Sequence, residues 1–279
     1  MAIILYHTNT TIPDHLKDCV AKIRQYSNIP IYLLTDCDYN IATVKVVNIN
    51  KYNEFKWLQD LDYFRGNDAM SHMWRTSCFR IFYIQKFMEE ETLNDVLHFD
   101  NDVLLYEKPE TLIEKISTKY NGFAITAHNS GEIVFGMSYI KNTELLSPIT
   151  RTIKKELLIP TNELKKKYGG YPSEMQIIAR AECEYLPILP TGLTDPRYTA
   201  NFQHFNSVFD PSSYGQYIAG TYAEKQPGWF GTHQEIGKFI GNSRIRVIFE
   251  DRNPFVLFEG NRIKINNLHI HSKDTGKYL

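Results

Sequence analysis

The sequence of 279 residues contains few cysteines and no paired cysteine motif. Its four cysteines are scattered along the chain, and none forms a Cys-x-x-Cys pair. A disulfide framework or a zinc knuckle is therefore not predicted, and reduced thiols in a cytoplasmic protein are the expectation. The N-terminus has no basic residues ahead of its short apolar run, Ala2 to Leu5, so we expect no secretory signal peptide.

Long apolar stretches and a charge excess are also lacking. No stretch approaches the roughly 20 apolar residues of a membrane-spanning helix, so we expect a soluble protein, or at most peripheral membrane contact through a surface patch. With 31 basic and 32 acidic residues, the formal net charge is -1. A whole-molecule field that would attract nucleic acid is thereby excluded, and an anionic ligand must meet a local positive site.

Apolar runs and amphipathic periodicity alternate along the first half of the chain. Strands are predicted at 2–6, 29–34, 44–49 and 96–99, and helices after Thr11 and over 68–87. This alternation predicts an α/β fold with a nucleotide-binding half over residues 1–107. We expect residues 1–279 to form a single domain. Its second half, residues 108–279, would bind the acceptor. Within that half, 189–241 is rich in Gly, Pro, Tyr and Asn, and we expect a long irregular region there.

Two carboxylates follow the apolar strand in Val96-Leu97-His98-Phe99-Asp100-Asn101-Asp102. At i and i+2 in extended backbone, Asp100 and Asp102 would project to the same side. Carboxylates, waters and phosphate oxygens are the ligands that Mg²⁺ and Mn²⁺ accept, and the carboxyl end of a strand is where α/β folds bind ligands. The pair therefore predicts a cation site at a diphosphate; the alternative is a solvated turn.

A second i, i+2 pair lies near the C-terminus, in Leu268-His269-Ile270-His271-Ser272-Lys273. In a strand both imidazoles would share one face, where one could complete the metal's coordination and the other bond a phosphate. Lys273 could provide a cation for the leaving diphosphate. Taken alone, the two histidines could equally be exposed residues of an edge strand.

Arg80 lies among apolar residues on the helix that precedes the Asp100 strand, where an unpaired guanidinium would be costly. It needs an anionic partner or an acceptor. Either a nucleotide or an acidic side chain in a structural ion pair would satisfy it.

Together these segments resemble glycosyltransferases of the GT-A fold, especially the lipopolysaccharide galactosyltransferase and glycogenin kinds. The resemblance rests on ILYHTN, IYLLTD, the helix with Arg80, VLHFDND and LHIHSK. The stretch with Phe209-Asp210, Gly215-Gln216-Tyr217 and Gly220 is similar to glycosyltransferases of bacterial capsule clusters and large algal viruses. In glycogenin-type enzymes, HIHSK is replaced by a longer His, Gly and Lys pattern.

The resemblance implies a Rossmann-like mixed central sheet flanked by helices, and a role for each matching residue. Metal ligands would be Asp100 and Asp102, together with His269 or His271. Residues expected at the nucleotide or donor are Tyr6, His7, Thr8, Asp36, Arg80, Asp100, Asn101, Gln176, His271 and Lys273. Glu174 would lie against the donor sugar or acceptor. Glu174, Asp195 and Asp210 are candidates for the carboxylate base that an inverting enzyme needs, although each could be a cap or a surface charge.

The expected activity is metal-dependent transfer of a sugar from a nucleoside diphosphate donor, with Mn²⁺ or Mg²⁺ as cofactor and UDP as the favoured nucleotide. The acceptor would be a hydroxyl of a glycan or of a lipid-linked or protein-linked glycoconjugate, as in polysaccharide biosynthesis. Two alternatives stay open. One is a haloacid dehalogenase-like phosphatase, which also has Asp-x-Asp after a strand but carries it near the N-terminus with a later acidic motif. The other is a non-catalytic module that binds nucleotide sugars or glycans.

Overall fold

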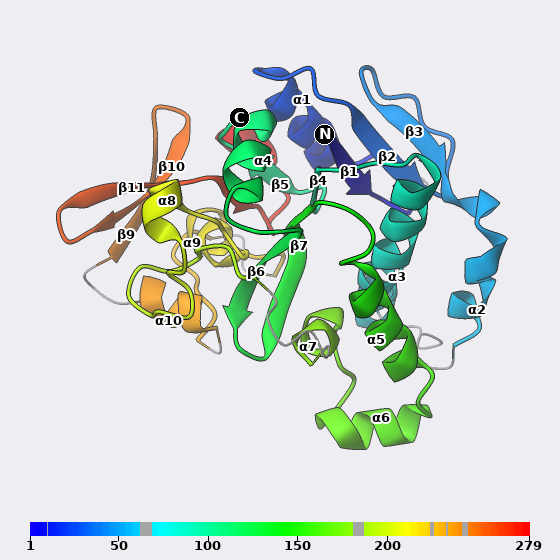
Figure 1. Cartoon of the computed structure of the whole chain (residues 1–279). Helices are drawn as coiled ribbons and strands as arrows, with labels where there is room; N and C mark the ends of the chain where they lie inside the picture. The colour runs from blue at the N-terminus through cyan, green and yellow to red at the C-terminus, as the bar shows by residue number, and fades with distance from the viewer. Residues whose placement is uncertain (10, 62–68, 181–186, 224–225, 233, 242–244) are drawn as a thin grey trace.

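The computed structural model describes residues 1–9, 11–61, 69–180, 187–223, 226–232, 234–241 and 245–279 (Figure 1). Its strands are β1 (Ala2–Tyr6), β2 (Ile31–Thr35), β3 (Lys45–Asn48), β4 (Val96–Phe99), β5 (Val103–Leu105), β6 (Phe123–Asn129), β7 (Glu132–Ile140), β8 (Ser207–Val208), β9 (Ile245–Glu250), β10 (Asn253–Phe258), β11 (Asn261–Ile265) and β12 (Asn267–His269). Its α-helices are α1 (Asp14–Arg24), α2 (Lys56–Gln59), α3 (Ala69–Glu90), α4 (Pro109–Ser117), α5 (Ser147–Leu157), α6 (Thr161–Tyr168), α7 (Glu174–Ala179), α8 (Phe202–Phe205), α9 (Ser213–Ala219) and α10 (Glu235–Ile240).

A six-stranded mixed sheet forms the centre of the molecule, in the order β3-β2-β1-β4-β7-β6. The first four strands in this order are parallel, whereas β7 runs antiparallel to β4 and β6 antiparallel to β7. The predicted α/β class, a mixed central sheet flanked by helices, is confirmed. Because β1 and β4 are adjacent and parallel, their carboxyl ends meet at one edge of the sheet, where α/β folds bind ligands.

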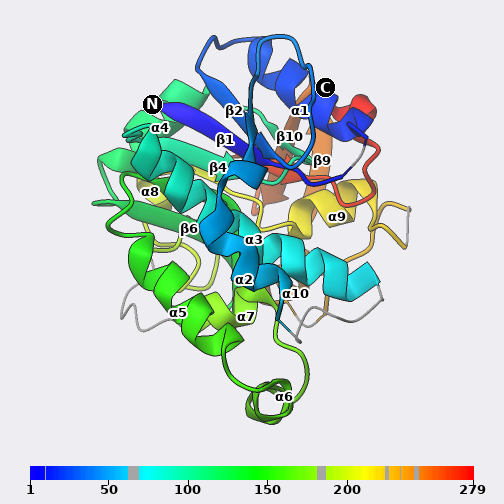
Figure 2. The same ribbon diagram turned by 90° about the vertical axis from the view of Figure 1, so that its right-hand side faces the viewer.

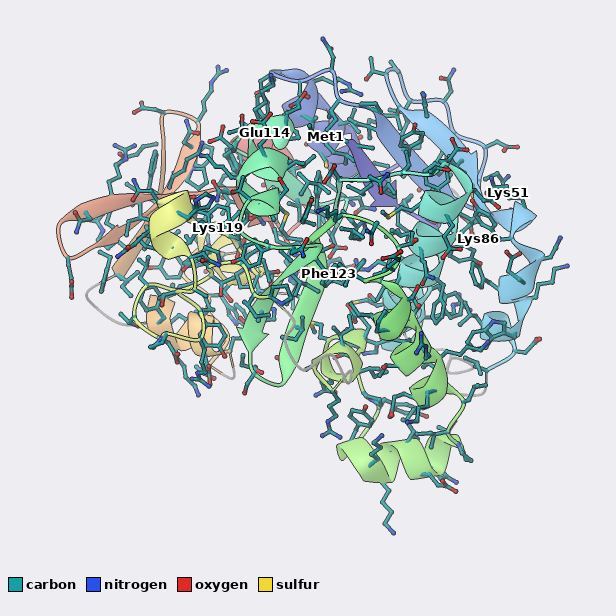
Figure 3. All side chains as sticks on the ribbon, in the orientation of Figure 1. Met1, Lys51, Lys86, Glu114, Lys119 and Phe123 are labelled. Carbon is teal, nitrogen blue, oxygen red and sulfur yellow. The ribbon has the colours of Figure 1, made fainter. Side chains whose placement is uncertain are left out.

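Helices cover both faces of this sheet because its strands are apolar on both sides. Along β1, Ile3 and Leu5 pack with α1 and α4 on one face. Ala2, Ile4 and Tyr6 pack with α3, α5 and α7 on the other. Figures 1 and 2 show these two layers around the sheet, with α6 projecting from the end of α5. Side chains occupy the space between the ribbons (Figure 3). Successive side chains of a strand point to opposite faces of the sheet, so a strand that is covered on both faces, such as β1, is a continuous apolar run.

Local signals explain where several helices begin and end. The spacing of Leu16, Val20 and Ile23 puts three buried side chains on one face of α1. Gly169 ends α6 in the left-handed conformation, with φ of 75°. Ser173 caps α7 through the backbone N–H of Gln176.

The expectation of a long irregular region at 189–241 was only partly right. The structure places α8, β8, α9 and α10 within it, and these helices span four, seven and six residues. Each of these helices has fewer than two turns, and β8 has only two residues. Elements this short produce no sustained hydrophobic periodicity in the sequence. The strand β8 joins a small second sheet, β8-β11-β10-β9, and β12 pairs with β5. None of the helices among the described residues has both the length and the apolar character needed to cross a membrane.

Candidate metal and donor site

Strand β4 ends in a tight turn that carries both acidic residues. The N–H of Val103 donates to the carbonyl of Asp100 over 3.0 Å, so the backbone here turns instead of staying extended as we expected. The N–H of Asp100 donates to the carbonyl of Gly136 on β7 over 3.1 Å. On the other side, the N–H of Ile270 donates to the carbonyl of Asp102 over 2.9 Å. The turn is therefore held between β7 and the C-terminal segment.

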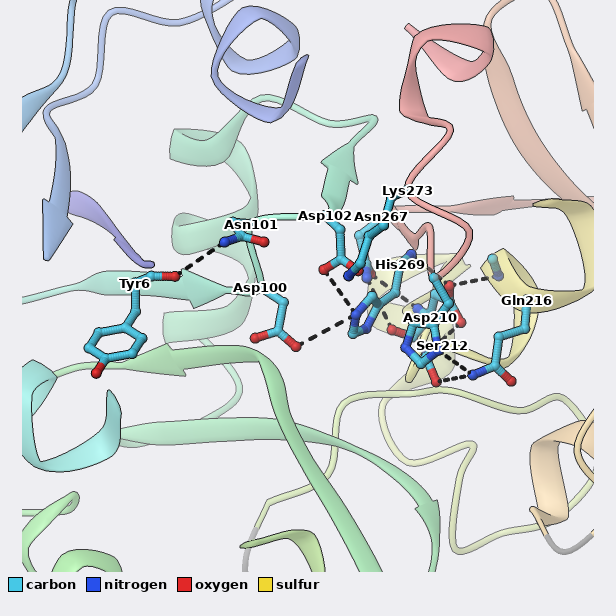
Figure 4. Close-up of polar contacts among 12 residues, drawn as sticks. Tyr6, Asp100, Asn101, Asp102, Asp210, Ser212, Gln216, Asn267, His269 and Lys273 are labelled. Carbon is cyan, nitrogen blue, oxygen red and sulfur yellow. Dashed lines mark hydrogen bonds and ion pairs between the residues drawn. The ribbon is translucent and has the colours of Figure 1, made fainter. Parts of the chain in front are cut away.

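Asp100, Asp102 and His269 converge as the sequence predicted (Figure 4). Strand β12 pairs antiparallel with β5, which puts His269 beside Val103 and next to the turn. Nε2 of His269 lies 3.1 Å from Oδ1 of Asp102 and 3.6 Å from Oδ2 of Asp100. One ligand atom from each of the three residues lies within 4.8 Å of the others. This is a spacing at which one cation could contact all three.

Each carboxylate turns one oxygen to this cluster and the other to a basic side chain. Arg80 contacts Oδ1 of Asp100, and Lys273 contacts Oδ2 of Asp102. Burial opposes ionisation of Asp102, yet the neighbouring His269 and Lys273 hold its pKa well below the ordinary value. Both acids are therefore oriented by partners outside the cluster, an arrangement typical of metal ligands.

The residues fit a divalent cation in donor type and in space. Two carboxylate oxygens and one imidazole nitrogen are a donor set that suits Mn²⁺, and the carboxylates alone suit Mg²⁺. Gly136 lies against the cluster: a Cβ at this position would be 2.4 Å from Oδ2 of Asp100 and 3.4 Å from Cε1 of His269. Asp100 and His269 can keep these positions only if residue 136 on β7 is a glycine, because a side chain there would collide with Oδ2 of Asp100.

Arg80 bridges two acids in a buried position. Besides Asp100, its Nη2 donates to Oε1 of Glu174 over 3.2 Å, and its guanidinium lies 5.5 Å from the centre of the Phe135 ring. Of the two partners considered for Arg80, the structure provides the acidic side chains. Burial raises the pKa of Glu174, opposed by the charge of Arg80. Glu174 Oε2 is buried without a hydrogen-bond partner among the described residues.

His271 lies just beyond β12, which ends at His269, so the two imidazoles do not share one strand face as we expected. Their rings nevertheless meet edge to face, with centres 4.4 Å apart. Nδ1 of His271 accepts from Nε2 of Gln216 over 2.9 Å. In the neutral ring, Nε2 then carries the proton and is the atom that could donate to a phosphate. Burial and the neighbouring His269 hold the pKa of His271 well below its ordinary value.

The structure argues against Asp210 as a base. Its Oδ1 accepts from the N–H groups of Ser212 and Tyr214, and its Oδ2 from those of Gly215 and His269, over 2.8 to 2.9 Å. A carboxylate has about four lone-pair positions, so these four backbone donors leave none for an acceptor hydroxyl. The sequence suggested Asp210 as a candidate base, whereas the structure shows its carboxylate bound to backbone N–H groups.

The remaining base candidate and Gln176 are also occupied by other partners. Asp195 forms an exposed ion pair with Arg197, and its Oδ1 accepts from the Arg197 N–H over 2.9 Å. Gln176, expected at the donor, accepts from the N–H of Ser173 over 3.3 Å and completes the cap of α7. It also lines a cavity of about 340 Å³, together with Ser130, Gly131, Tyr168, Ala179 and Arg180.

The residues expected at the nucleoside follow β1 and β2. Nδ2 of Asn101 lies 2.9 Å from Nδ1 of His7 and donates to the carbonyl of Tyr6 over 3.4 Å, which ties the acidic turn to the end of β1 (Figure 4). The ring of Tyr6 is buried and stacks on Tyr83, so only its backbone faces the turn. Burial lowers the pKa of His7, opposed in part by Asp36, which is exposed at the end of β2. Thr8, also expected here, is half-buried beside His7.

Three polar residues near the cluster were not among the predicted site residues. His15, on α1, lies close enough to the cluster to be affected by it: burial lowers its pKa, the charge of Lys273 lowers it further, and that of Asp102 opposes this. Gln216 contacts His271, and His128 is buried against Ser212, with Nε2 3.1 Å from the hydroxyl oxygen. His128 lies on β6, one residue before the strand ends. His15 and Gln216 carry no local signal, because their proximity depends on how α1 and α9 pack.

No protein-family model matches this sequence, and no curated protein matches it. Solved structures are similar to it at low identity. Mouse xyloside xylosyltransferase 1, in its apo form, is 10% identical over 73% of this chain and 92% of that chain, with a TM-score of 0.47. The galactosyltransferase LgtC, with donor and acceptor sugar analogues, is 14% identical over 64% and 69%, with a TM-score of 0.41. A glycosyltransferase involved in glycosylation of the major capsid of PBCV-1 is 12% identical over 67% and 78%, with a TM-score of 0.36. All three are named as glycosyltransferases.

Proposed function

We propose that this protein transfers a sugar from a nucleoside diphosphate donor, with UDP as the favoured nucleotide, to a hydroxyl of a glycan or glycoconjugate. The observation that carries the proposal is the convergence of Asp100, Asp102 and His269. In addition, Lys273 contacts Oδ2 of Asp102, the oxygen that faces away from His269. Two carboxylates and an imidazole beside a cation are suited to a diphosphate group, because the group brings negative charge and oxygen ligands.

The three converging residues would hold Mn²⁺ or Mg²⁺. The bound ion would supply Lewis-acid stabilisation of the charge that develops on the departing diphosphate. Lys273 would offset the same charge directly, since its ammonium lies beside Asp102 on the half-exposed side of the site. His271 would donate from Nε2 to a phosphate oxygen.

Residues at the ends of β1 and β2 would bind the nucleoside. Asn101 and His7 form a hydrogen-bonded pair at the end of β1, and Asp36 is exposed at the end of β2. Asp36 and Thr8 could accept hydrogen bonds from ribose or base. Asn101 would hold the acidic turn in a fixed position relative to the residues that bind the nucleoside.

Arg80 and Glu174 would act on the sugar side of the site. Arg80 fixes the outer oxygen of Asp100, and Glu174 fixes Arg80. Glu174 stays our candidate for the carboxylate that meets the donor sugar or the acceptor hydroxyl, because its Oε2 is the acceptor that this pair leaves uncommitted. The acceptor hydroxyl would attack the anomeric carbon as the diphosphate leaves.

The test combines binding and turnover. We expect UDP to raise the melting temperature of the wild-type protein in the presence of Mn²⁺, and the rise to disappear with EDTA or in D100N/D102N. A screen of nucleotide sugars should then reveal Mn²⁺-dependent hydrolysis or transfer. Nucleotide binding that is indifferent to metal would count against this mechanism. Phosphatase turnover with a phosphoaspartate would favour the dehalogenase-like alternative.

A further inference from the structure

A single buried carboxylate connects helix α9 to strand β12. Asp210 is 1% exposed, and it accepts four backbone N–H bonds. Three of the donors lie at the start of α9: Ser212, Tyr214 and Gly215. The fourth is His269, whose side chain is in the metal cluster. The carboxylate is thus shared between the first turn of a helix and the backbone of a proposed metal ligand.

The main chain of Asp210 is also held by hydrogen bonds. Its N–H donates to Oδ1 of Asn267 over 3.1 Å, and its carbonyl accepts from Nδ2 of Asn267 over 3.0 Å. Asn267 is fully buried and lies two residues before His269 on β12. Asp210 therefore holds β12 at two points, once through its main chain and once through its carboxylate.

Close packing shows how little freedom this junction has. A Cβ on Gly215 would lie 2.1 Å from the carbonyl oxygen of His269 and 2.9 Å from Oδ2 of Asp210. Helix α9 thus approaches the backbone of His269 directly, at a position where only glycine fits. Together with the pairing of β12 to β5, this contact restrains the backbone that carries the His269 imidazole, because β12 is only three residues long.

We propose that Asp210 is a positioning residue that sets the register of β12 and thereby aims His269 at the cation; this rests on the proposed function. Asp210 does not touch the substrate or the cation. It acts through the backbone of His269, as an outer-shell partner that orients a metal ligand. Such a role explains why an acidic residue is buried here, since an ionised carboxylate alone can accept all four N–H bonds.

The test uses D210N on the full-length protein. The amide has one acceptor oxygen, so two of the four N–H groups would face an NH₂ group instead of an acceptor. We expect the affinity for Mn²⁺, titrated alone and followed by electron paramagnetic resonance, to fall about 10- to 100-fold. Amide exchange of residues 267–271 should speed up in the metal-free protein.

E156Q is the matched control, because Glu156 is also a buried acid but pairs with Lys167 on α5 and α6. It should leave Mn²⁺ affinity unchanged even if the melting temperature falls. If D210N is less stable yet binds Mn²⁺ as the wild type does, the positioning role is refuted. If D210N does not fold, G215A serves instead: its methyl would push against the carbonyl of His269 without removing a charge, and unchanged Mn²⁺ affinity would again refute the proposal.

The two proposals fail separately. A wild-type protein that binds no divalent cation overturns the proposed function. In that case the exchange of the His269 amide still decides whether Asp210 holds β12: unchanged exchange in D210N overturns that role as well, and faster exchange supports it.

Discussion

Gly136 on β7 faces Asp100 so closely that a methyl group on it would lie 2.4 Å from Oδ2 of that residue. The same methyl would lie 3.4 Å from Cε1 of His269. The glycine has no positive φ, so the reason for it is space and not backbone strain. Its carbonyl also accepts from the Asp100 N–H, which ties the acidic turn to the strand that leaves room for it.

G136A should therefore abolish or strongly weaken Mn²⁺ binding while leaving the fold intact, because the new methyl displaces the inner oxygen of Asp100. Calorimetric titration measures Mn²⁺ binding, and a circular dichroism spectrum shows whether the fold is intact. G276A is the matched control, since a Cβ at Gly276 would meet only Asp18, at an ordinary distance of 3.8 Å. Normal metal binding by G136A would mean that the cation does not sit between Asp100 and His269.

The Arg80 and Glu174 pair should show the behaviour of a buried ion pair. Their side chains are 8% and 4% exposed, so loss of Arg80 leaves the buried carboxylate of Glu174 without a compensating charge. We expect R80M to lower the free energy of unfolding by about 3 to 5 kcal/mol, and R80M/E174M to recover part of that loss. Urea unfolding of the two variants and of E174M measures the coupling between them.

The exposed pair Lys17 and Asp14 provides the comparison for that cycle. K17M should leave the free energy of unfolding nearly unchanged, because solvent screens the pair. Strict additivity of the R80M and E174M effects would contradict a direct interaction between the two buried residues.

Lys273 should matter for the diphosphate and Lys277 should not. Both line a cavity of about 450 Å³, but Lys277 pairs with Asp274, whereas Lys273 contacts Asp102 in the cluster. We expect K273M to weaken UDP binding in the presence of Mn²⁺ by about 10- to 100-fold, the worth of a charge-assisted hydrogen bond. K277M should bind UDP as the wild type does. Equal losses in both variants would indicate a general effect of surface charge.

Much of the fold was predictable because its core strands are short apolar runs with clear boundaries. The strand that ends at Phe99 lies where local signals put it. Asp100, Asp102 and His269 were predictable as a cluster because their residue types suit a cation, and because the two acids follow an apolar strand. These are local properties that a sequence displays directly.

The supporting residues could not be predicted in the same way. Asp210 resembled a base, but its four donors come from α9 and β12, two elements separated by more than forty residues in the sequence. Gly136 gives no sign in the sequence that its missing side chain makes room for Asp100. Such roles depend on contacts between distant segments, and the sequence pattern carries no information on which backbone atoms meet.

His98 should make the protein sensitive to mild acid. It is fully buried on β4, with Nδ1 2.8 Å from the carbonyl oxygen of Ile4, and burial and the charge of Arg80 lower its pKa from 6.5 to about 3. Between these two pH values the unfolded chain binds a proton at His98 that the folded chain does not. Stability from this residue is therefore fully present above pH 6.5 and is lost as the pH falls towards 3. Lowering the pH from 7 to 5 should reduce the free energy of unfolding by about 2 kcal/mol through His98 alone.

Urea unfolding at both pH values measures the loss in the wild type and in H98N, whose amide can still donate to Ile4. The variant should lose about 2 kcal/mol less than the wild type over this interval, and an equal loss in both proteins would show that His98 is not the group that takes up the proton.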